Sequence, residues 1–129
     1  MPQKLVQIAI VVNDYDEAID YYTNYLGFKL IEDTELSAVK RWVLVSPNAE
    51  NSCQILLAKA VGDEQKSRIG NQTGGRVFLF LQTDDFWKDY ENYTKKGINF
   101  IRKPIEETYG IVAVFEDIYG NLWDLIQYK

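Results

Sequence analysis

The sequence predicts an α+β fold built from two tandem βαβββ modules, whose mixed sheets curve around a groove. Three observations predict it: an order of elements that occurs twice, a common spacing between the corresponding signals, and strands that pair an apolar face with a mixed one. The 129 residues fit one domain. We divide this domain (1–129) into a first module at residues 1–59, a linker at 60–74 and a second module at 75–129.

The first module begins with an apolar, β-branched run at residues 4–12, which predicts a strand. Asp14 follows as an expected N-cap, with Glu17 three positions later, as in a capping box. Aromatic and apolar residues then recur at helical spacing until Gly27, which is expected to end the helix. Three further strands are expected at residues 28–31, 40–45 and 53–58.

The second module repeats this order. A strand is expected at residues 76–81, and Asp84 is expected to cap a helix that runs to Lys96 and ends at Gly97. Pro104 is expected to end the next strand, because proline has no backbone N–H to give to a sheet. The strands predicted after the helix lie at residues 98–101, 111–115 and 122–127.

An offset of 70 residues relates the two modules. It pairs Asp14 with Asp84, Gly27 with Gly97 and Gln54 with Asp124 in the printed sequence. Each match alone carries little weight, but the shared offset at a cap, a stop and a strand favours a duplicated supersecondary unit.

Alternation along the strands separates an apolar face, expected under a helix, from a face that mixes polar and apolar residues. A mixed face suits a ligand groove better than a packed core. The groove-facing residues are expected to be Gln7, Gln54, Arg76, Asp124, Trp42, Phe78 and Phe80. The aromatic members of this set are suited to stacking on a flat ligand, and equally to filling the groove as core, so both interpretations stay open.

Composition excludes several classes of function. The chain has no histidine, so any mechanism that needs an imidazole is closed to it. A net charge of −5 disfavours nucleic acid as a partner. No apolar stretch approaches membrane-spanning length, and the single cysteine, Cys53, excludes an internal disulfide framework. We therefore expect a cytoplasmic protein.

Three segments of the chain resemble the vicinal oxygen chelate superfamily of glyoxalases, bleomycin-resistance proteins and extradiol dioxygenases. They are the opening Gln-Ile-Ala-Ile-Val-Val-Asn-Asp, the helix end Tyr-Leu-Gly-Phe and the closing Ala-Val-Phe-Glu-Asp-Ile-Tyr-Gly-Asn-Leu-Trp-Asp-Leu. The resemblance covers essentially the whole chain. It implies a homodimer and a groove that binds a small molecule.

In metal-dependent members, four groove-facing residues hold a divalent ion, and the resemblance maps these positions onto Gln7, Gln54, Arg76 and Asp124. Arginine has no lone pair to give, so we expect no metal and no cofactor here. Arg76 and Asp124 are expected either to pair with each other or to leave Arg76 free to bind a ligand's carboxylate or phosphate.

Three functions stay open. The leading hypothesis is a metal-independent protein that binds a small molecule in its groove. A second is a lyase or isomerase of the glyoxalase type, using a divalent metal or Asp124 as its base. A third is a dimeric interaction protein with a vestigial groove, for which Trp87 is a candidate interface residue.

Overall fold

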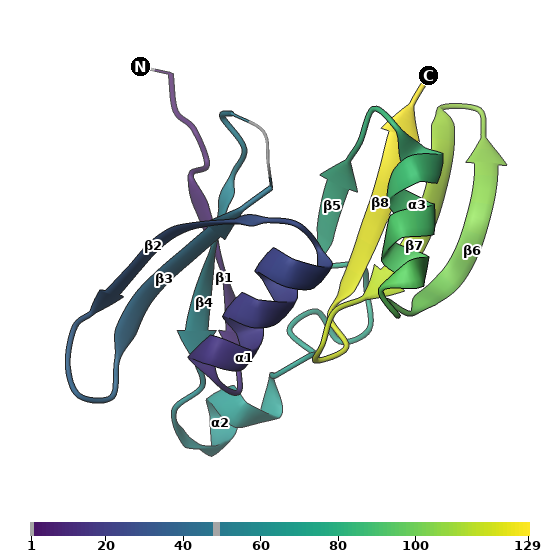
Figure 1. Cartoon of the computed structure of the whole chain (residues 1–129). Helices are drawn as coiled ribbons and strands as arrows, with labels where there is room; N and C mark the ends of the chain where they lie inside the picture. Colours follow the sequence, from purple (N-terminus) through teal and green to yellow (C-terminus); the bar gives the residue numbers. More distant parts are fainter. Residues whose placement is uncertain (1, 48–49) are drawn as a thin grey trace. The chain divides into compact units, whose positions relative to one another are not determined.

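The computed structural model describes residues 2–47 and 50–129. The chain divides into two compact units, Met1–Ile69 and Gly70–Lys129, and each contains a four-stranded mixed sheet (Figure 1). The order of elements confirms the α+β class and the two βαβββ modules predicted from the sequence.

The first unit has the strand order β1-β4-β3-β2, in which β1 runs parallel to β4 and the other neighbours are antiparallel. Its helices lie after β1 and after β4 (Figure 1). The elements are β1 (Gln7–Val12), α1 (Tyr15–Asp20), the π-helical turn η1 (Tyr21–Tyr25), β2 (Lys29–Glu35), β3 (Arg41–Ser46), β4 (Gln54–Lys59) and α2 (Gly62–Ser67).

The first helix begins and ends where the sequence predicts. The Asp14 carboxylate accepts a hydrogen bond from the Glu17 backbone N–H at 3.0 Å, which satisfies one donor of the first turn. Gly27 has a φ of 77°, a left-handed conformation that glycine adopts without steric cost. Tyr22, fully buried, packs against Phe28 just beyond this stop.

Arg41 ties three elements of the first unit together. Its guanidinium contacts Asp33 of β2 at 2.6 Å and Asp16 of α1 at 2.9 Å, and it lies 5.2 Å from the centre of the Tyr15 ring. The hydrogen bond from Arg41 holds the pKa of Asp33 below its usual value. The hairpin of β2 and β3 is thereby fastened to the start of α1.

The second unit has the strand order β5-β8-β7-β6, with β5 parallel to β8. Helix α3 lies across one face of this sheet (Figure 1). The elements are β5 (Leu79–Gln82), α3 (Phe86–Lys95), β6 (Phe100–Glu107), β7 (Gly110–Glu116) and β8 (Leu122–Tyr128).

Two boundaries at the start of the second unit differ from the prediction. Strand β5 begins at Leu79 rather than at residue 76, because Gly74 and Gly75 both have positive φ and Arg76 lies in the bend that follows them. The cap of α3 is Asp85 and not Asp84: the Asp85 carboxylate accepts from the Lys88 backbone N–H. Gly97, with a φ of 86°, ends the helix as predicted.

Strand β6 corrects the prediction for Pro104, which does not end the strand. The strand continues from Phe100 to Glu107 through the proline. It is an edge strand, and Pro104 falls between Arg102 and Ile105, where the register shifts. Proline is tolerated at edges and irregularities because its missing N–H removes no ladder bond there.

Both modules carry a β-bulge at matching places. The pairing of β2 with β3 shifts between Leu30 and Glu32, and that of β6 with β7 shifts between Phe100 and Arg102. Each bulge adds one residue, so the side chains beyond it change faces relative to simple alternation. The bulge in β6 decides which residues join Asp124 on one face of the sheet.

None of the helices in the described part of the chain has the length and apolar character needed to span a bilayer.

Candidate functional site

A row of four side chains crosses the sheet of the second unit. Phe80 of β5 is the register partner of Asp124 of β8, Asp124 is the partner of Val114 of β7, and Val114 is the partner of Arg102 of β6. Register partners on neighbouring strands project from the same face of a sheet. The structure therefore aligns an aromatic ring, a carboxylate, an apolar side chain and a guanidinium across four strands.

Helix α3 covers the opposite face. The centre of the Tyr90 ring on the helix lies 4.5 Å from the centre of the Phe100 ring, and the centres of the Tyr93 and Phe115 rings are 5.5 Å apart. Phe115 in turn stacks on Trp123, which is 2% exposed and forms part of the core. Because Trp123 and Asp124 are consecutive in β8, Asp124 faces away from the helix. We call the face that carries Phe80, Asp124, Val114 and Arg102 the open face.

Asp124 is in an unfavourable place for a charge. Its Oδ1 atom is buried, and it has no hydrogen-bond partner among the residues that the structure describes. Burial raises the pKa of the Asp124 carboxyl above its usual value, and the nearby charge of Arg102 lowers it by a smaller amount. Arg102 is thus the cation that interacts electrostatically with the Asp124 carboxylate.

Arg76 does not pair with Asp124. The Arg76 residue is exposed in the bend before β5, and its backbone oxygen accepts from the Thr73 hydroxyl at 2.6 Å. No ion pair joins Arg76 to Asp124, although both lie in the described part of the chain. The ion pair expected between them is therefore wrong, because Arg76 precedes the strand that was to carry it.

The other expected residues of the second unit lie close to the row. Phe80 is 66% exposed on the open face and is the direct neighbour of Asp124. Phe78 is half-buried just before β5, where its backbone N–H donates to the Leu122 oxygen at 2.9 Å.

In the first unit, Gln7 and Gln54 are direct register partners on β1 and β4, and both are half-buried. The structure brings these two amides together. Trp42, also half-buried, is two residues from Leu44 on β3 and so shares its face.

The offset of 70 residues misaligns the last strands of the two modules. Leu56 is the register partner of Ala9 and of Leu44. Asp124 holds the same place between Phe80 and Val114. The counterpart of Asp124 in the first module is therefore Leu56, and the expected match with Gln54 is wrong by two residues.

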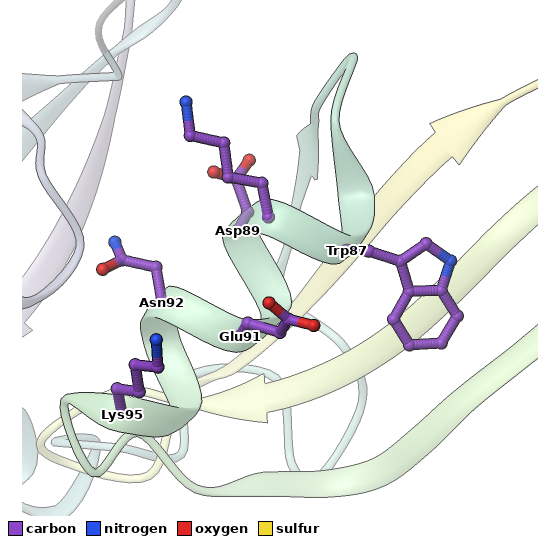
Figure 2. A pocket seen from close by; sticks show the side chains of 6 residues that line it. Trp87, Asp89, Glu91, Asn92 and Lys95 are labelled. Atoms are coloured by element: carbon purple, nitrogen blue, oxygen red, sulfur yellow. The ribbon is translucent and has the colours of Figure 1, made fainter.

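A hollow of about 520 Å³ lies along α3, on the helix rather than on the open face. Figure 2 shows Trp87 on one side of the helix and Asn92 and Lys95 on another. All of its lining residues belong to this helix, and the set contains none of the groove-facing residues expected from the sequence. A surface made by one helix offers a ligand little enclosure.

The family model of the Glyoxalase/Bleomycin resistance protein/Dioxygenase superfamily matches residues 4–125. The chain belongs to this superfamily. It is 62% identical over 128 residues to an uncharacterized protein of Shewanella frigidimarina (strain NCIMB 400), with 98% of this chain and 95% of that one covered.

Two solved structures share the fold of this chain. The crystal structure of UcmS2 matches with a TM-score of 0.85 and 27% identity, over 98% of each chain. TnmS3, an antibiotic binding protein from Streptomyces sp. CB03234, matches with a TM-score of 0.79 and 24% identity, over 99% of this chain and 98% of that one.

The residues of this superfamily member do not fit a divalent transition ion. The chain has no histidine to offer. Gln7 and Gln54 are neutral amides, Leu56 has no donor atom, and Asp124 is a single carboxylate, a set too weak for zinc, nickel or iron. Within residues 2–47 and 50–129, no group of three or more His, Cys, Asp and Glu side chains is placed to hold a metal ion.

Arg102 is the member of this row of side chains that the sequence did not predict. In an unbroken strand Arg102 would share the face of Phe100, which packs under the helix. The extra residue, Ile101, moves Arg102 to the face of Asp124. The signal that could have found it is the Ile-Arg-Lys-Pro segment, since proline marks an irregular edge where alternation fails.

Proposed function

We propose that this protein binds a small organic molecule on the open face of its second unit without a metal ion. The observation that carries the proposal is the buried, unpartnered Oδ1 of Asp124 beside the exposed ring of Phe80. A buried acceptor without a partner costs free energy that a ligand donor can recover. An exposed aromatic ring next to it offers a stacking surface.

The fold supports the proposal. TnmS3, which has the same fold, is an antibiotic binding protein. An antibiotic with an aromatic ring, which could stack on the exposed Phe80, therefore belongs in a first ligand panel. The donor set of this chain supports the metal-independent part, because neutral amides, a leucine and one carboxylate hold divalent ions poorly.

The test is a panel of aromatic amines, aromatic carboxylates and neutral aromatics, titrated calorimetrically in buffer with EDTA. We expect saturable binding of at least one class. Phe80→Ala is expected to weaken it about 5- to 10-fold, the value of one stacked ring. Tyr109→Ala is the matched control, because Tyr109 is also half-exposed but packs on Tyr128 instead.

Binding that disappears in EDTA would contradict the metal-independent proposal. An equal loss of affinity in the Phe80 and Tyr109 variants would contradict the assignment to the open face.

A metal-free lyase or isomerase with Asp124 as base is the second candidate. The pKa of Asp124 is raised, and a raised pKa brings a carboxylate closer to the strength of a useful general base. An activity assay with an α-oxo thiohemiacetal decides between the two, because product formed from it in the presence of EDTA would establish catalysis without a metal ion. We also propose that the protein is cytoplasmic and that it forms a homodimer.

A further inference from the structure

We infer that the ligand of the open face is an aromatic molecule carrying a short alkylammonium group, which donates a hydrogen bond to the carboxylate of Asp124 while its ring stacks on Phe80. This inference rests on the proposed function and names its ligand class.

The Asp124 carboxylate lacks a hydrogen-bond donor for its Oδ1 atom within the described part of the chain. An ionised carboxylate only accepts hydrogen bonds, and its row neighbours Phe80 and Val114 have no side-chain donor to give. The Oδ1 atom has no hydrogen-bond partner among the described residues, so the protein itself compensates the charge of this carboxylate poorly. An ammonium group supplies both a donor and the opposite charge, and such charge-assisted bonds are about twice as strong as neutral ones.

The spacing of the strands sets the length of the ligand. Phe80 and Asp124 are register partners on adjacent strands, which lie about 4.8 Å apart. A ring placed on Phe80 therefore reaches Asp124 with a linker of two or three bonds between ring and nitrogen. This is the geometry of an arylethylamine.

The surrounding charges fix the direction of the ligand. Arg102 lies on β6, two strands beyond Asp124 and so about 10 Å away across the sheet. An ammonium group is repelled by Arg102, so it approaches Asp124 from the β5 side, where Phe80 lies.

Three indoles that differ only in the end group of a short side chain test the inference. They are tryptamine with an ammonium, tryptophol with a hydroxyl, and indole-3-propionate with a carboxylate. Titration calorimetry at pH 7.5 in EDTA is expected to rank their affinities in that order. Tryptamine should bind at least about 10-fold more tightly than indole-3-propionate, the factor that one charge-assisted hydrogen bond contributes.

Asp124→Asn is expected to bring this ratio close to one, while Asp84→Asn, which removes the same charge at an exposed position, leaves it unchanged. Phe80→Ala should weaken all three probes by a similar factor and keep their order. Circular dichroism and thermal melting of each variant establish that it is folded.

The outcomes separate the two proposals. Binding of all three indoles with equal affinity, or preference for the carboxylate, overturns the ammonium inference and leaves small-molecule binding standing. An unchanged ratio in Asp124→Asn overturns the role of Asp124 as the selecting residue. Failure of all three indoles and of the wider panel overturns both proposals.

Discussion

The Asp124 side chain keeps a carboxylate oxygen buried and without a hydrogen-bond partner among the described residues, an arrangement that destabilises a folded protein. Residues of this kind persist where binding needs them. We therefore expect Asp124→Asn to raise the free energy of unfolding at pH 7.5, by about 1 kcal/mol or less because the residue is only half-buried. Urea denaturation followed by circular dichroism measures this change.

The pH dependence of that gain follows from the raised pKa of Asp124. The folded state holds the proton more tightly than the unfolded state, whose pKa is near the ordinary 3.8. The free energy of unfolding therefore falls as the pH rises from that value through the folded pKa. The advantage of Asp124→Asn should shrink as the pH is lowered through this window. Asp84→Asn is the control, and an Asp124→Asn variant less stable than the wild type at pH 7.5 would contradict this account.

At the residue scale, the sequence was sufficient to place Phe80 and Asp124 on one face of the sheet, but not to place Arg102 there. Alternation placed Phe80 and Asp124 correctly on one face because β5 and β8 pair without a register shift. It failed for Arg102 because one bulge residue, Ile101, reverses the face, and for Arg76 because two glycines delay the start of β5. Leu56 and the absence of histidine, rather than Arg76, therefore make this chain a poor ligand for a divalent metal ion.

At the scale of the element, the start of α3 separates two adjacent aspartates that the sequence could not rank. Asp85 caps the helix by accepting from the Lys88 N–H, and the Thr83 hydroxyl accepts from the Asp85 N–H at 3.0 Å. Asp85→Ala is expected to lower the free energy of unfolding by about 0.5–1 kcal/mol, the usual value of an N-cap. Asp84→Ala, one residue earlier, should change it by a few tenths at most.

Thermal or urea unfolding of the two alanine variants checks this ranking. A larger loss of stability in Asp84→Ala than in Asp85→Ala would contradict this ranking and would make Asp84, the residue predicted from the sequence, the N-cap of α3. The elements themselves were predictable because strong stops, such as Gly27 and Gly97, have a local cause in positive φ. The ends of the elements were less predictable. Strand β6 continues through Pro104 because β6 lies at the edge of the sheet, and that position depends on residues far away in the sequence.

At the scale of the whole molecule, the repeated order of elements was predictable because each module must bury one sheet face under its own helix. The repeat does not specify the register between strands, which is why Gln54 was matched with Asp124 in place of Leu56. Association between chains is likewise set by surfaces that a repeat does not describe. We propose that Trp87 marks such a surface.

Trp87 is 53% exposed and contacts Phe86 and Tyr90 of its own helix edge-on. Large exposed aromatic rings are enriched where chains associate. We expect light scattering after size exclusion to give a mass about twice the 15.0 kDa of one chain. Trp87→Arg should shift the protein to the monomer, because a buried interface does not accept an unpaired charge. Val39→Arg, at an apolar residue that is 82% exposed in the first unit, should leave the mass unchanged. A monomeric wild type, or a dimer that survives Trp87→Arg, would remove α3 from the interface.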